Sequence, residues 1–90
     1  MPLFTIVADF QGGTYLTQVE AENERQAASL WPESKELHDI AVPLGLPLRE
    51  LGYALSDPEA TPVGDLRHCW SVTADVENQV LLLHIIRTTE

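Results

Sequence analysis

Residues 80–86 read Val-Leu-Leu-Leu-His-Ile-Ile, a run in which every side chain except that of His84 is apolar. Valine and isoleucine at this density are typical of a β-strand. An antiparallel strand usually exposes alternate side chains to water, whereas this one has apolar residues on both of its faces. We therefore predict a strand that is covered twice. The core covers one face, and either the segment 42–64 or another chain covers the other.

The residues before this run complete a hairpin with it. Side chains alternate over residues 66–74, and Asn78 can adopt the left-handed conformation of a tight turn. Pairing about Glu77 and Asn78 places Ser71 opposite His84. The predicted core face holds His68, Trp70, Val72, Ala74, Leu81, Leu83 and Ile85. The predicted outer face holds Cys69, Ser71, Thr73, Val80, Leu82, His84 and Ile86.

The start of the chain predicts a second hairpin. Apolar and polar residues alternate over residues 3–10 and again over residues 14–20, and the glycines at residues 12–13 tolerate the positive φ angles of a two-residue loop. With these glycines as the loop, Phe10 faces Tyr15. One side of this hairpin is apolar, so we expect a helix to cover it.

A helix is predicted directly after this hairpin. Asn23 and Gln26 have the spacing of a capping box. The residues that follow at helical spacing are Ala27, Leu30, Trp31, Ser34 and Leu37. Pro32 lacks the N–H that an inner helical turn requires, so we expect the helix to stop near Leu30, or to kink there and resume through Glu33 to His38.

Residues 42–64 combine prolines and glycines with leucines, which predicts an ordered excursion rather than a linker. Pro47 suits the first turn of a short helix in which Leu48, Leu51 and Leu55 share one face.

Turns are predicted at Asp57–Pro58 and at Thr61–Pro62. The resulting order is β-β-α-(short α)-β-β. It predicts an α+β fold in which a small antiparallel sheet of two β-hairpins packs on one main helix. We expect residues 1–90 to form a single domain, because a chain of 90 residues has enough apolar surface for one core.

The charge balance excludes several classes of partner. The chain has 14 acidic and 5 basic residues and a formal net charge of −9. No basic patch is available to neutralise phosphates, so nucleic-acid binding is not expected. No apolar run reaches membrane-spanning length, so no membrane association is expected. The start of the chain lacks a basic signal-peptide region and Cys69 is the single cysteine, which together predict a cytoplasmic location.

The strongest catalytic candidates are Cys69, Ser71 and His84, because the predicted register brings a thiol and a hydroxyl near an imidazole. No third group that could orient the imidazole is evident, so we assign no catalytic residue and expect a protein that is not an enzyme. The histidines His38, His68 and His84 fall on different elements or faces. We therefore expect no metal site and no cofactor.

Acidic residues cluster around the predicted helix, and they are Glu20, Glu22, Glu24, Glu33, Glu36 and Asp39. Summed charge of this kind attracts basic proteins over long distances. We therefore predict a non-enzymatic protein that acts by protein–protein binding, as an immunity-like or antitoxin-like neutralising partner of a basic protein. Two alternatives stay open: a homodimeric accessory protein, and an enzyme that uses Cys69 and His84. The candidate interface residues are Val80, Leu82, His84, Ile86, Glu20, Glu22 and Glu24.

Overall fold

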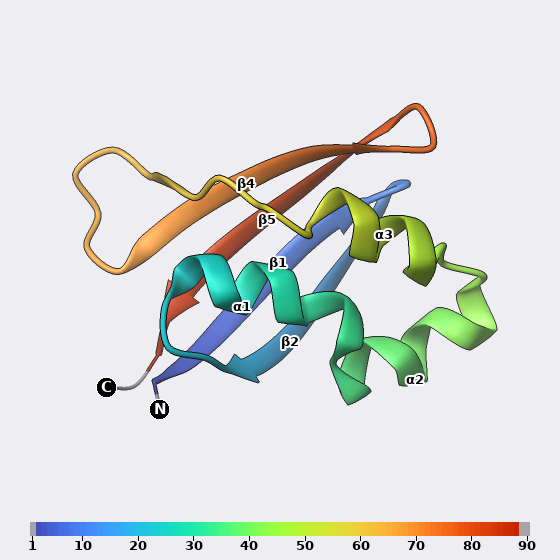
Figure 1. Cartoon of the computed structure of the whole chain (residues 1–90), viewed down its shortest axis with the longest axis horizontal. Helices are drawn as coiled ribbons and strands as arrows, with labels where there is room; N and C mark the ends of the chain where they lie inside the picture. Colours follow the sequence, from blue (N-terminus) through green and yellow to red (C-terminus); the bar gives the residue numbers. More distant parts are fainter. Residues whose placement is uncertain (1, 89–90) are drawn as a thin grey trace.

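A computed structural model describes residues 2–88 of the chain, apart from the side chains of residues 40 and 42–44. The elements in chain order are β1 (Leu3–Phe10), β2 (Gly13–Glu20), α1 (Glu24–Leu30), the 3-10 helix η1 (Trp31–Glu33), α2 (Lys35–Leu44), α3 (Leu48–Ala54), β3 (Thr61–Pro62), β4 (Cys69–Val76) and β5 (Gln79–Arg87). The strands form one antiparallel sheet in the order β2-β1-β5-β4-β3, and the helices gather on one side of it (Figure 1). The predicted α+β class is confirmed.

The prediction of one main helix is wrong. Asn23 caps α1 as predicted, and its side-chain oxygen accepts a hydrogen bond from the Gln26 backbone N–H at 2.8 Å. The helix stops at Leu30, one residue before η1, in which Pro32 occupies an early position where its missing N–H costs nothing. Ser34 then caps a separate helix, α2. No helix within residues 2–88 is long and apolar enough to cross a membrane.

The first hairpin forms with a loop one residue earlier than predicted. Gln11 and Gly12 occupy the turn, with φ angles of 51° and 80°, and Phe10 pairs with Gly13 rather than facing Tyr15. A two-residue turn of this kind requires positive φ at both central positions, and here a glutamine adopts one of them. The register changes by two residues, so every side chain keeps its predicted face.

The second hairpin has the predicted register. Glu77 and Asn78 form the turn, with φ angles of 51° and 66°, and Ser71 pairs with His84. The prediction for His68 is wrong. The strand begins at Cys69, and His68 precedes it as an exposed residue with a φ angle of 58°.

The core lies between the helices and one side of the sheet. The side chains of Phe4 in β1, Trp31 in η1 and Leu81 in β5 are at most 1% exposed. The remaining large side chains that are fully buried are Ile6, Leu37, Leu51, Leu55, Leu83, Ile85 and Val76. Burying each such side chain contributes roughly 1.5–3 kcal/mol relative to its exposure. The sheet is therefore fixed to the helices through alternate residues of its strands.

The excursion over residues 42–64 packs on this same side. Leu51 and Leu55 are buried in the core, as the predicted short helix requires, and α3 lies against β4 and η1. The predicted turn at Thr61–Pro62 is wrong, because these residues form β3 on the outer edge of β4. The described part of the excursion therefore leaves the opposite side of the sheet uncovered.

Candidate protein-binding face

The side of the sheet opposite the helices carries the second set of alternating side chains. We call this side, which bears Val7, Leu16, Thr73 and Leu82 on the four long strands, the open face. The register places Leu16 beside Val7, and Val7 beside His84. These side chains therefore form rows that run across neighbouring strands.

Apolar side chains on the open face are accessible to solvent. Leu16 is 64% exposed, Val80 is 61% exposed and Ile86 is 39% exposed. Val7 and Leu82 are half-buried among them. Contiguous exposed apolar surface on a folded protein is typical of an interaction site, whereas isolated exposed residues are not.

The charged residues of the open face are carboxylates. Asp9, Glu20 and Asp75 share the face with the apolar side chains, and the Thr14 hydroxyl donates a hydrogen bond to Asp9 Oδ1 at 2.7 Å. The four long strands contain a single Lys or Arg, Arg87, which lies on the core side in register with Phe4. The described part of the open face therefore presents negative charge with no Lys or Arg beside it.

The predicted interface residues fall into two groups. The structure places on the open face Glu20, Val80, Leu82, His84 and Ile86. Glu22 follows β2, and Glu24 is the first residue of α1, on the helical side. The backbone N–H of Glu22 donates to Gln26 Oε1 at 2.6 Å, so this segment is held against the helix. The acidic residues around the helices therefore lie apart from the apolar strand residues, except for Glu20.

The three catalytic candidates lie together on the open face. Ser71 pairs directly with His84, and Cys69 pairs with Ile86, one pleat further along. Within residues 2–88 no hydrogen bond joins the three side chains. Cys69 is partly buried at the start of β4. Covalent catalysis requires a nucleophile within hydrogen-bond reach of a base, and the described side chains of these three residues form no such bond.

The three histidines are separated in space by the fold. His38 lies on α2, where its Nε2 atom is 3.0 Å from the Pro32 carbonyl oxygen. His68 lies in the turn before β4, and His84 lies on the open face. The described residues contain no group of three or more His, Cys, Asp or Glu side chains that could hold a metal ion.

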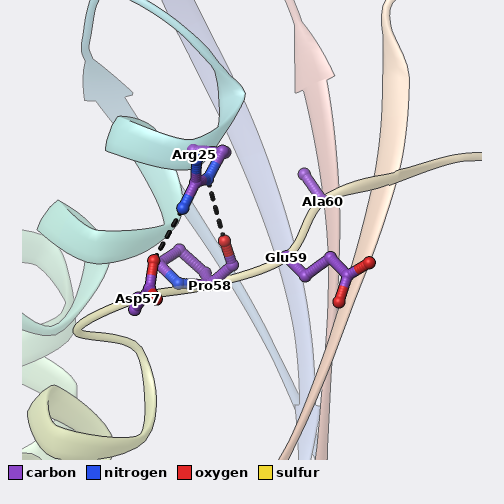
Figure 2. A pocket seen from close by; sticks show the side chains of 5 residues that line it. All are labelled: Arg25, Asp57, Pro58, Glu59 and Ala60. Atoms are coloured by element: carbon purple, nitrogen blue, oxygen red, sulfur yellow. Dashed lines mark hydrogen bonds and ion pairs between the residues drawn. The ribbon is translucent and has the colours of Figure 1, made fainter.

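A polar hollow of ≈ 360 Å³ lies between α1 and the segment that follows α3 (Figure 2). Arg25 donates from Nη2 to Asp57 Oδ1 at 2.6 Å and from Nε to the Pro58 carbonyl oxygen at 3.0 Å. Glu59 and Ala60 complete its lining. Since the guanidinium is already bonded to its own chain, we interpret this hollow as a structural connection rather than a binding site. The sequence offers no signal for it, because its partners are 32 residues apart.

Sequence reasoning also missed part of the open face. Val7 and Leu16 are apolar residues on the polar side of the first hairpin, and neither was predicted as an interface residue. The alternation places them there correctly. Val7 and Leu16 lie on the same face as the apolar residues of β5 because β1 is the neighbour of β5 in the sheet. No local sequence pattern predicts the order of strands in a sheet.

Comparison of the chain with protein-family models, with curated proteins and with solved structures found no match. Its function is therefore inferred from the geometry and charge of the described residues.

Proposed function

We propose that this chain is a non-enzymatic protein that binds a basic protein through the open face. The observation that carries the proposal is the combination of exposed apolar side chains with carboxylates and no Lys or Arg on the described strands of that face. A fitting partner surface is apolar at its centre and has Lys or Arg at its rim.

The apolar residues supply affinity in this proposal. Leu16 and Val80 are each more than half exposed, so a partner can remove them from water. Each Å² of apolar surface buried contributes about 25 cal/mol before the costs of association are subtracted. The half-buried Leu82 lies between Asp9 and Thr73 in the register, two residues along β5 from the exposed Val80.

The acidic residues supply attraction at a distance. The net charge of −9 favours encounter with positively charged proteins, and Asp9, Glu20 and Asp75 direct that attraction to the open face. A neutralising partner, in the manner of an immunity protein or an antitoxin, uses such charge to cover a basic site. This charge complementarity favours a basic partner over a second open face, since two open faces bring carboxylates together.

The proposal is tested by reversing charges on and off the open face. The tagged wild-type chain, the double variant Glu20→Lys with Asp75→Lys, and the control Glu33→Lys with Glu50→Lys are compared as baits in lysate of the source organism. The control residues are exposed and lie on η1 and α3. We expect a basic protein that binds wild type and control but not the open-face variant, and whose binding weakens as salt increases.

An acidic or neutral partner, or binding that is indifferent to both the salt concentration and the open-face reversal, contradicts the proposal. Folding of each variant is checked by circular dichroism, so that a lost partner is not confused with a lost fold.

A second candidate function is a homodimeric accessory protein whose open faces pack together. The exposure of Val80 and Ile86 on β5 favours it, because residues 45–64 do not cover them. Light scattering of the wild type and of Leu82→Lys together decides between the two functions. A face-to-face dimer has twice the chain mass of 10.0 kDa, and Leu82→Lys splits it.

A further inference from the structure

The outer edge of β2 is an unpaired strand edge. Within residues 2–88 the sheet ends at β2, which has β1 on one side and no strand on the other. The strand is 8 residues long, and its pairing with β1 is continuous from end to end. We propose that two copies of this chain pair through these edges, antiparallel, so that one sheet runs through the dimer.

The hydrogen bonds of β1 show which backbone groups of β2 point outward. The N–H and C=O groups of one residue in an antiparallel strand point to the same side. The Leu3 carbonyl accepts from Thr88 N at 2.7 Å, so Leu3 directs its groups toward β5. Its partner Glu20 therefore directs its groups away from β1, and the same alternation applies to Gln18, Leu16 and Thr14.

The two edges of the sheet differ in their protection against strand addition. On the far edge, β3 covers part of β4, and Pro62 removes an N–H donor there. In contrast, β2 contains no proline, lysine or arginine, and Leu16 is exposed at its middle. A long, regular edge without these devices is a template for another strand.

Charge determines the orientation of the second copy, which is antiparallel. Glu20 is the single charged residue of β2 and lies at its end. Antiparallel pairing about Thr17 sets Glu20 opposite the uncharged Thr14 of the second copy, and Leu16 opposite its Gln18. Parallel pairing instead brings the two Glu20 carboxylates together, which is unfavourable.

A hollow lies beside this edge. It has a volume of ≈ 300 Å³ and is lined by Thr5, Leu16, Thr17, Gln18 and Glu36. Glu36, on α2, brings one carboxylate per copy near the pairing site. Because each copy also has a net charge of −9, added salt is expected to strengthen the dimer. Salt has the opposite effect on the binding of a basic protein, so the two proposals fail independently.

The first experiment measures mass by light scattering over a range of protein and salt concentrations. We expect the wild-type mass to rise from 10.0 kDa toward twice that value as both concentrations increase. Gln18→Pro removes an outward N–H that forms no hydrogen bond with the described residues, and we expect a monomer. Val80→Lys, which alters the open face on an inner strand, is the matched control and is expected to dimerise like wild type.

The second experiment needs no variant. We expect hydrogen exchange of the backbone amides of Leu16 and Gln18 in wild-type protein to slow at least tenfold as the dimer becomes populated. A wild-type chain that stays monomeric at every concentration overturns the proposal and leaves the edge to an extended segment of another protein. Unchanged exchange of these amides in a populated dimer also overturns it, as does a dimer that Val80→Lys disrupts and Gln18→Pro does not.

Discussion

Thr17 is a buried hydroxyl residue whose Oγ1 atom has no hydrogen-bond partner in the described part of the chain. It is 3% exposed and lies on the core side of β2. A buried polar group without a partner costs about 1–3 kcal/mol. We predict that Thr17→Val, which replaces the hydroxyl with a methyl group, increases the free energy of unfolding by about 1 kcal/mol.

Urea denaturation checks the prediction for Thr17. Thr73→Val is the control, because Thr73 is exposed and its hydroxyl is accessible to water, so little change is expected. A loss of stability in Thr17→Val but not in Thr73→Val contradicts the prediction and indicates that a bound water pairs with the Thr17 hydroxyl.

The conformations of single residues explain which turns and strand ends were predicted correctly from the sequence and which were not. Asn78 has a well-known preference for the left-handed turn, and the register about it was predicted correctly. Gln11 adopts a similar φ angle without any such preference, so the loop was predicted at the two adjacent glycines, Gly12 and Gly13, one residue too late. His68 was placed on the core face because alternation continues beyond the point where pairing ends. The start of a strand depends on its neighbours as well as on its own residues.

At the scale of elements, the N-terminus of α1 provides a test of local stability. Asn23 accepts from the Gln26 N–H at 2.8 Å, whereas Ser34, at the start of α2, accepts from the Leu37 N–H at the longer distance of 3.4 Å. We predict that Asn23→Ala lowers the free energy of unfolding by about 1 kcal/mol, and that Ser34→Ala lowers it by less. Thermal denaturation of both variants measures the difference. An equal or larger loss in Ser34→Ala contradicts this ranking.

The connection between α1 and the segment after α3 belongs to the same scale. Arg25 and Asp57 have side chains that are 61% and 87% exposed, and water weakens such pairs. We predict a coupling energy of about 0.2–1 kcal/mol from a double-mutant cycle with Arg25→Ala and Asp57→Ala. Arg25→Ala is expected to destabilise more than Asp57→Ala, because Arg25 also donates to the Pro58 carbonyl. A coupling well above this range contradicts the interpretation of a weak surface connection.

Elements were predicted well where a local pattern specifies them, as in both hairpins and the helix formed around Leu51. The arrangement of elements was predicted less well, because it depends on contacts between distant parts of the chain. The covering of β5 is an example. Its two apolar sides were evident in the sequence, but the choice between residues 42–64 and another chain required the position of α3.

For the whole molecule, the two proposed surfaces are compatible. The edge of β2 and the open face belong to the same sheet, so pairing of two edges leaves both open faces free and places them in one continuous surface. Ionic strength separates the two interactions. The Debye length falls from about 10 Å at 0.1 M to about 3 Å at 1 M salt, which reduces both repulsion between copies and attraction to a basic partner.

Neighbouring residues of β5 test the one-sided core directly. Leu81 is 0% exposed, whereas Val80, the preceding residue, is 61% exposed on the open face. We predict that Leu81→Ala lowers the free energy of unfolding by about 2–5 kcal/mol, because it removes buried atoms and leaves a cavity. Val80→Lys is expected to change it by less than about 0.5 kcal/mol, since the lysine extends into water. Urea denaturation at low and high protein concentration checks both values. A large loss for Val80→Lys that grows with concentration indicates that a second chain covers the open face in the native state, and it then favours the face-to-face dimer over binding of a basic protein.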